Sequence, residues 1–350
     1  MLILDGATGE GGGQVLRTSL ALAALLGQPF ELRNIRAARP KPGLAAQHLT
    51  SVRAVAQIAA AALAGDDFGS QTLRFEPRRR QGGQYVFDVA DIKPSAGATG
   101  LIVQAILPPL LFCREPSSVI LRGGTHVAWS PHYHYLAEVF LPTLALMGAR
   151  VQVELVRAGW YPLGGGEVRL RVQPVEQLQP LELTSRGKLQ WRGWSALSNL
   201  PEHILRRQVQ GAEEVLRPGG ISQVRWEHQQ LPARGKGTCC FLVGESGPVR
   251  VGFTGLGERG KRAEKVGAAA AEQAVTYQRT GQALEEHLAD QLILYLALAA
   301  GRSAFTASRL SLHLLTNIWV VEQFLAVKFT VVGQEGEPGR VEVEGVGMVN

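Results

Sequence analysis

The spacing of apolar residues divides the chain into alternating helices and strands. Apolar positions recur with a helical period over residues 14–26 and 44–63, and residues 30–35 between them alternate like a strand. Two short strands follow at 72–75 and 85–89, joined by an arginine- and glycine-rich turn. Together these segments predict one αβαββ unit.

The same order of elements recurs twice without repeating the sequence itself. The second copy has helices over 99–112 and 133–147 and strands over 118–121, 151–156 and 167–172. The third copy has helices over 288–298 and 313–325 and strands over 304–307, 328–332 and 340–343. Three αβαββ units therefore account for most of the chain.

Residues 182–281 break this rhythm. They contain strand-like segments at 188–194, 226–227 and 239–243 and helical segments at 202–216 and 262–277. We therefore expect an α/β (α+β) protein with a large domain, residues 1–181 and 282–350. Residues 182–281 are expected to form a smaller inserted α/β domain.

Composition indicates a folded protein that does not cross a membrane. Hydrophobic residues make up 45% of 350 residues, enough for a full core. The longest apolar runs, 20–26 and 106–112, are shorter than the ~20 residues that a membrane helix needs. The N-terminus lacks the pattern of a signal peptide. Cys113, Cys239 and Cys240 form neither a disulfide framework nor a spaced zinc set, so we expect a cytoplasmic protein with the adjacent cysteines in a buried strand.

The net charge of +6 permits a polyanionic partner, and one basic cluster is placed to grip phosphate. Arg33, Arg36, Arg39 and Lys41 stand around a proline- and glycine-rich loop between a strand and a helix. We interpret the second cluster, residues 78–80, as a solvated hairpin turn.

Two further features bear on chemistry. The run from Gly9 to Gln14 precedes a helix, so its backbone N–H groups can approach an anion, and Glu10 within it could hold a divalent cation. The run is neither a Walker A motif nor a dinucleotide fingerprint, and a plain tight turn is the default interpretation. His313 begins an otherwise apolar helix, where a lone histidine is more often a cap or a core residue than a catalyst.

Several separated motifs nevertheless agree in order with one family. The matching segments span nearly the full length: Leu4-Asp5-Gly6, Gly9 to Gln14, Ile35 to Leu44, Gln47-His48-Leu49, Gly69-Ser70, Ser95-Ala96-Gly97, Gln104, Gly123-Gly124-Thr125, Tyr161-Pro162 with the glycines at 164–166, Leu288 to Gln291, and His313 to Asn317. In these motifs the chain resembles the RNA 3'-terminal phosphate cyclase family.

The resemblance implies a large domain of three units similar to the C-terminal domain of translation initiation factor 3, with a smaller inserted domain. It implies ATP and RNA 3'-phosphate ends as substrates. The sequence leaves open whether the chain forms a homodimer. It also implies that His313 is the nucleophile that takes AMP from ATP and that Glu10 helps hold Mg²⁺ or Mn²⁺.

The same resemblance assigns binding residues. The nucleotide is expected between Pro131 and His287, which stands where the family has tyrosine, and along Gln104, Leu288, Ala289, Asp290 and Gln291. Residues expected near phosphates are Arg17, Arg36, Arg39, Lys41, Gln47 and His48. Two other classes share the architecture: a non-catalytic cyclase-like ribosome-assembly factor, which lacks the nucleophilic histidine, and a phosphoenolpyruvate-using transferase of the shikimate type, which does not need it.

Overall fold

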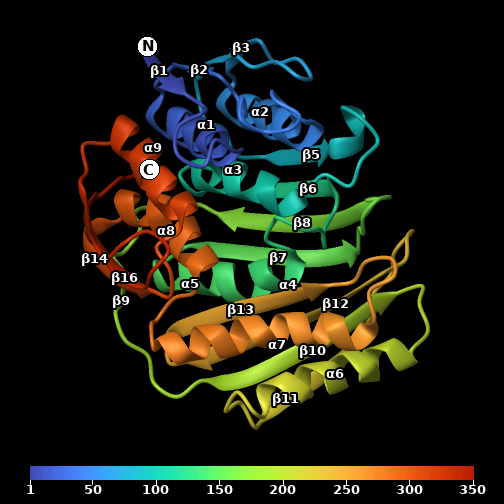
Figure 1. Cartoon of the computed structure of the whole chain (residues 1–350). Coiled ribbons are helices and arrows are strands. Elements are labelled where there is room, and N and C mark those ends of the chain that lie inside the picture. Colours follow the sequence, from blue (N-terminus) through green and yellow to red (C-terminus); the bar gives the residue numbers. More distant parts are fainter.

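The computed structural model describes residues 1–350 as a mixed α/β protein with four four-stranded sheets (Figure 1). The first sheet has the order β1-β2-β4-β3. Its unit comprises β1 (Leu2–Asp5), α1 (Gln14–Leu26), β2 (Phe30–Arg33), α2 (Ala46–Ala59), β3 (Ala62–Ala64) and β4 (Leu73–Glu76). None of the helices in the structure combines the length and the apolar character needed to span a bilayer.

The second and third sheets repeat this order of strands, as β5-β6-β8-β7 and β9-β14-β16-β15. In each sheet the first strand along the chain (β1, β5 or β9) pairs in parallel with the second. The last strand along the chain (β4, β8 or β16) lies between two strands and pairs antiparallel with both. The second unit comprises β5 (Gln84–Asp88), the short helix η1 (Val89–Asp91), α3 (Thr99–Leu111), β6 (Ser117–Gly123), α4 (Tyr133–Tyr135), η2 (Leu136–Phe140), α5 (Leu141–Leu146), β7 (Arg150–Arg157) and β8 (Gly166–Gln173). The third comprises β9 (Glu182–Leu183), α8 (Glu286–Leu298), β14 (Ala300–Ala307), α9 (Leu312–Phe324), β15 (Phe329–Val332) and β16 (Gly339–Val346).

The fourth sheet, in the order β11-β10-β12-β13, lies at the far end of the molecule from β1 (Figure 1). Its unit comprises β10 (Gln190–Ser198), α6 (His203–Leu216), β11 (Val224–Gln230), β12 (Gly237–Ser246), β13 (Val249–Leu256) and α7 (Ala263–Thr280). The chain enters this unit after β9 and leaves it before α8. The short strand β9 was expected to begin the inserted segment, but it pairs with β14 and so belongs to the third sheet.

Two predictions about the first 90 residues are wrong. The helix expected to reach residue 63 ends at Ala59, because Ala60 takes a left-handed conformation with φ of 45° and the chain then forms β3. The predicted hairpin does not form, because β4 pairs with β2 and β3 while β5 pairs in parallel with β6 of another sheet. The half-buried guanidinium of Arg80 donates instead to the carbonyl of Leu25.

One apolar cluster of 95 buried residues runs through the molecule. Helix α1 is buried along nearly its whole length, since α2, α3 and α9 all pack against it. The three cysteines are buried and unpaired, and Cys239 and Cys240 lie in the buried strand β12, as predicted. This packing brings the glycine run before α1 next to the first turn of α9, so residues about 300 positions apart in the chain share one site.

Candidate active site

The glycine run at residues 9–13 is seated against the first turn of α9. The backbone N–H of Glu10 donates to Thr316 Oγ1 over 3.1 Å. Gly9 has φ of 61°, and a Cβ there would lie 2.1 Å from the same hydroxyl oxygen. Only glycine fits this left-handed position without displacing α9. The close approach places Glu10 beside His313.

Glu10 is the centre of a small charged cluster. Its Oε1 lies 3.6 Å from His313 Nε2 and forms an ion pair with the guanidinium of Arg39. Its Oε2 is buried and has no hydrogen-bond partner. A buried carboxylate oxygen without a partner is costly, and a hard divalent cation would satisfy it. Glu10 therefore fits the predicted metal ligand.

His313 neither caps its helix nor fills the core. The N-cap of α9 is Ser311, whose Oγ accepts from the N–H of Leu314 over 3.2 Å, and the His313 side chain is 46% exposed. Partial burial lowers the pKa of His313, Asp290 opposes this effect, and Arg17 adds to it. The neutral imidazole is thus the favoured form near pH 7, which is the form that acts as a nucleophile.

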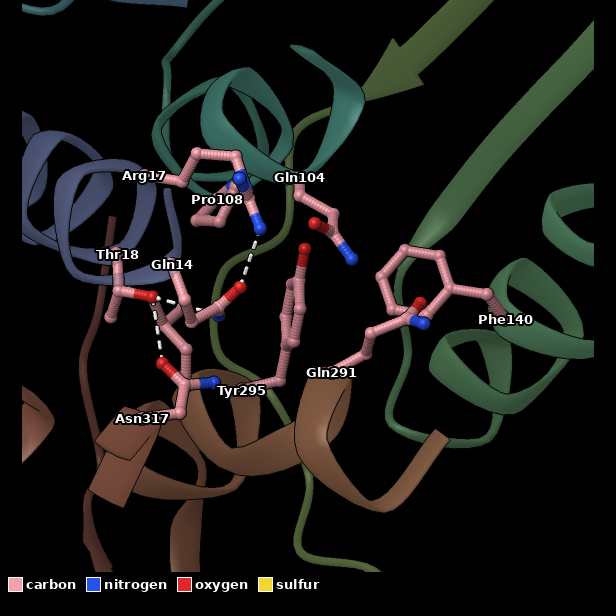
Figure 2. Close-up of a pocket in the computed structure, with 10 residues that line it drawn as sticks. Gln14, Arg17, Thr18, Gln104, Pro108, Phe140, Gln291, Tyr295 and Asn317 are labelled. Atoms are coloured by element: carbon pink, nitrogen blue, oxygen red, sulfur yellow. Dashed lines mark hydrogen bonds between the residues drawn. The ribbon is translucent and has the colours of Figure 1, made fainter. Parts of the chain in front are cut away.

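A chain of hydrogen bonds joins α1, α8 and α9, and Figure 2 shows its links between Arg17, Gln14, Thr18 and Asn317. Asn317 Nδ2 donates to the carbonyl and to Oδ1 of Asp290, over 2.9 and 3.3 Å, and Thr18 Oγ1 donates to Asn317 Oδ1 over 2.7 Å. Gln14 Nε2 donates to Thr18 over 3.2 Å, and Arg17 Nη2 donates to Gln14 Oε1 over 2.7 Å. This network fixes Asp290, whose pKa is raised by burial, and Arg17, whose pKa burial lowers to about 10.

A small polar cavity opens beyond Arg17. Gln104 from α3 and Gln291 and Tyr295 from α8 point into it (Figure 2). The side-chain oxygens of all three are buried and lack protein partners. Buried polar atoms are nearly always paired, so these groups are placed to receive a polar ligand or ordered water. The structure brings Gln104 and Gln291 together in this cavity, and their binding of the nucleotide stays a prediction.

A second cavity, of about 240 Å³, lies on the open side of His313. His287, Asp290 and Arg309 line it together with His313. His287 is 67% exposed, so its ring is available to a ligand. Pro131 does not line this cavity and instead packs against Gly100 at the start of α3. The side chains of Leu288 and Ala289 are fully buried in the core, so they do not face it either.

Glu285 holds the first turn of α8, where His287 stands. As the N-cap, its carboxylate accepts from the N–H groups of His287 and Leu288, both over 2.7 Å. The hydroxyl of Tyr135 also donates to Glu285, which ties α8 to the second unit. Burial raises the pKa of Glu285.

The basic loop lies on the other side of the glycine run. Arg36, with φ of 53°, donates to the carbonyl of Gly43 over 2.7 Å and closes the loop. Arg39 reaches Glu10, whereas Lys41 is exposed. The cluster predicted to grip phosphate therefore contributes Arg39 directly to the site and Arg36 to the shape of the loop.

His48 and Arg17 flank Gly13. A Cβ on Gly13 would lie 2.5 Å from His48 Nε2 and 2.8 Å from Arg17 Nη1. Burial, together with the positive charges of Arg17 and Arg36, lowers the pKa of His48 to about 3. Gln47 turns away and accepts from the N–H of Ala98 over 3.1 Å, which is a structural contact.

Thr316 and Asn317 belong to the motif that begins at His313, and both make contacts in the site for which the sequence predicts no role. With His313 they stand at positions i, i+3 and i+4 of α9, which place three side chains on one helix face. That spacing was the available signal. The contacts of Tyr135 with Glu285 and of Thr18 with Asn317 join residues far apart in the chain, so no local spacing in the sequence indicates them.

Comparisons with known proteins agree on one family. The family model described as RNA 3'-terminal phosphate cyclase matches residues 8–331. A protein of that name from Methylococcus capsulatus is 46% identical over 99% of this chain and 97% of its own length. Relatives of the same name from Gloeothece citriformis and Pyrobaculum aerophilum are 46% identical over 93% of both chains and 41% identical over 98% of both.

Among solved structures, the enolpyruvyl transferase NikO from Streptomyces tendae aligns with 99% of this chain and 82% of its own, with a TM-score of 0.24 and 10% identity. That likeness is too low to support a statement about the fold.

Proposed function

This chain belongs to the RNA 3'-terminal phosphate cyclase family, and on that premise we propose that it converts an RNA 3'-terminal phosphate into a 2',3'-cyclic phosphate at the expense of ATP. The observation that carries the proposal is the state of His313. Its imidazole is half exposed and lies beside Glu10, which pairs with Arg39. Because Ser311 is the N-cap of α9, the imidazole has no capping role.

In the first step the neutral imidazole of His313 attacks the α-phosphorus of ATP. A phosphorus–nitrogen bond forms, the bond to the bridging oxygen breaks, and pyrophosphate leaves. The product is AMP on His313, a phosphoramidate that stays reactive toward oxygen nucleophiles. Asp290 raises the pKa of the His313 ring and Arg17 lowers it. Asn317 positions Asp290 by donating a hydrogen bond to its carbonyl.

In the second step an oxygen of the RNA 3'-phosphate attacks the same phosphorus, and the bond to His313 breaks. RNA(3')pp(5')A forms and the imidazole is regenerated. The neighbouring 2'-oxygen then attacks the RNA phosphorus, AMP leaves, and the hydroxyl proton passes to solvent. Because this closure is intramolecular, proximity supplies much of its rate, with effective molarities of about 10⁵ M or more.

Negative charge is the main obstacle, since triphosphate and RNA phosphate meet in one site. Arg39 offers a planar fork for phosphate oxygens, and Arg17 and the loop shaped by Arg36 add positive potential. Glu10 would hold Mg²⁺ or Mn²⁺ through the unpartnered Oε2, and the ion would offset phosphate charge. His287 and Gln104 are proposed to bind the nucleotide from the two cavities.

We also infer that the first three sheets are repeated units of one large domain and that the β10–α7 segment is an inserted domain. The common strand order of the three sheets supports the first inference. The entry of the chain into the fourth sheet between β9 and α8 supports the second.

ATP labelled at the α-phosphate tests the proposed activity. The wild-type chain should retain acid-labile, alkali-stable AMP, and peptide mapping should place it within residues 310–319. A 3'-phosphorylated RNA should discharge the label, and a 2'-deoxy end should stop before the cyclic product. A chain that retains no AMP would fit the assembly-factor or transferase alternatives.

A further inference from the structure

Three histidines outside the proposed active site converge at the junction of the second and fourth sheets. His126 follows β6, and His132 and His134 stand at the start of α4. All three are buried, with exposures of 2%, 3% and 3%, and one nitrogen from each lies within 4.8 Å of the others. Their His-x5-His-x-His spacing contains no cysteine and so differs from the cysteine-based zinc motifs.

Each imidazole is held on its outer side by an oxygen from a neighbouring side chain. The outer contacts are His126 Nδ1 to Thr125 Oγ1 over 2.8 Å, His134 Nε2 to Gln229 Oε1 over 2.9 Å, and His132 Nε2 to Thr254 Oγ1 over 2.5 Å. The other nitrogen of each ring makes none of these outer contacts. His126 Nε2 and His134 Nδ1 are 3.0 Å apart, and His132 Nδ1 is buried without any partner.

This division of each ring is the arrangement found around metal ions, where one nitrogen binds the ion and the other is fixed by an outer-sphere oxygen. We propose that His126, His132 and His134 form a site for a divalent transition metal of the zinc type. Imidazole nitrogen suits Zn²⁺, Ni²⁺ and Cu²⁺ rather than Mg²⁺, so the site is chemically distinct from the oxygen ligand at Glu10. Burial lowers the pKa of all three histidines, which leaves them in the neutral, ligating form.

The distances are compatible with a tetrahedral ion after a small adjustment. With zinc–nitrogen bonds of about 2.05 Å, ligand atoms stand about 3.3 Å apart. The His126–His134 pair already lies at 3.0 Å, whereas the ligand atoms of all three rings lie within 4.8 Å of one another, so closure requires the His132 ring to move inward by up to about 1.5 Å. The fourth position would be left to water.

The surroundings assign the ion a positioning role. Gln229 and Thr254 belong to β11 and β13, so the site ties α4 to the fourth sheet. The His126 ring stacks on Trp160 at 4.8 Å, and Phe241 meets the His132 ring edge-on at 5.1 Å. Aromatic rings of this kind limit the access of solvent to the site.

A metal-free explanation makes the opposite prediction. The His126–His134 contact can be a simple hydrogen bond, in which case His132 Nδ1 is an unsatisfied group. Replacing His132 with Phe would then cost little or even stabilise the fold, because an unpaired buried polar atom disappears. In the metal-bound protein the same change removes a ligand.

The test uses the full chain without a polyhistidine tag, stripped with a chelator and titrated with Zn²⁺. We expect one equivalent per chain by calorimetry and elemental analysis, and a rise in melting temperature with Zn²⁺. His132→Phe should lose this equivalent. Thr254→Val, which keeps all three ligands, should weaken binding by about 10- to 100-fold. His228→Ala, an exposed histidine on β11, is the matched control and should bind like wild type.

Glu10→Ala should still bind one equivalent of Zn²⁺, which would place the ion outside the active site; loss of that equivalent in Glu10→Ala would overturn the proposal. The proposal is overturned if wild type takes up no stoichiometric Zn²⁺, or if His132→Phe and Thr254→Val both bind it as tightly as wild type. Should His132→Phe fail to fold, Thr254→Val decides alone. AMP labelling is measured separately, so failure of the zinc site leaves the proposed cyclase activity standing, and the reverse also holds.

Discussion

At the scale of single residues, His313 has no structural role at the start of α9, because Ser311 is the N-cap of this helix. Because Ser311 caps α9 and the imidazole is half exposed, His313→Asn should change the free energy of unfolding by less than about 1 kcal/mol. Formation of the AMP adduct should fall below detection. Thermal melts and retention of labelled AMP check both halves, and label on the Asn variant would exclude His313 as the nucleophile.

The negative charge of Asp290 influences the pH at which His313 gains a proton. Asp290 raises the pKa of His313 against the effect of burial, so removing its charge lets that pKa fall further. In Asp290→Asn the acid limb of the rate of AMP transfer should therefore move to lower pH. Single-turnover rates from pH 4 to 8 measure the shift. A limb that moves to higher pH would mean that Asp290 does not act on His313 through charge.

Glu10 and Arg39 form an ion pair, but we expect their alanine variants to respond differently to added metal. Glu10→Ala should lower AMP transfer in a way that added Mn²⁺ partly restores, because the remaining phosphate and protein groups can still bind the ion. Arg39→Ala loses a phosphate donor and should be slower by about 10²-fold at every metal concentration. Arg78→Ala, on an exposed loop residue, is the control. Identical metal titrations for the Glu10 and Arg39 variants would contradict these roles.

The single residues of the site were predicted unevenly. His313, Glu10 and Arg39 were assigned from motifs, and the structure places them in contact. Leu288 and Ala289 share a motif with Asp290, yet a helix turns their side chains into the core. Thr18 could not be predicted, because its partner Asn317 lies 299 residues away.

At the scale of elements, the loop before α1 depends on what its glycines touch. A Cβ on Gly12 would lie 2.1 Å from Glu10 Oε2, the end of a movable side chain, so Gly12→Ala should displace Glu10 and impair AMP transfer with little loss of stability. Gly9→Ala should lose both, since its Cβ would strike Thr316 within α9 from a left-handed backbone.

Gly27→Ala provides the control for backbone strain. Gly27 has φ of 65° but nothing within 4 Å of the added methyl group. We expect a cost of about 1–2 kcal/mol and unchanged AMP transfer. Urea unfolding and single-turnover labelling on the three variants separate strain from displacement. Equal activity loss in Gly27→Ala and Gly12→Ala would refute the contact argument.

Local patterns located most helices but not the strand partners. Residues 14–26 were predicted with both ends correct, because Gly13 and Gly27 bound a stretch whose apolar residues recur with a helical period. The hairpin at 72–89 was wrong because the alternation of a strand carries no information about its partner. β5 instead finds β6, which begins at Ser117.

At the scale of the whole molecule, the buried neutral His48 makes acid stability measurable. It stays neutral in the folded state down to a pKa of about 3, whereas in the unfolded chain it takes a proton below about 6.5. Its contribution to the free energy of unfolding therefore falls as pH drops through this window, by up to about 1.4 kcal/mol per pH unit. In His48→Gln, whose amide can still accept from Ala45, this part of the slope should vanish.

Urea titrations at pH 7, 6, 5 and 4 compare the two proteins. The curves of stability against pH should converge as the solution becomes more acidic. Parallel curves would show that His48 is not kept neutral by the fold.

The placement of β9 has a consequence for the order of synthesis. β9 must wait for β14, whose pairing residue Ala304 lies 122 positions after Glu182, and the long intervening unit is translated first. Pairings over such separations slow folding, and chains on the ribosome acquire structure from the N-terminus onward. The helix that carries His313 completes the site only afterwards. We therefore expect the proposed transfer of AMP to appear only after residues 304–317 have been synthesised and have folded onto the preceding units.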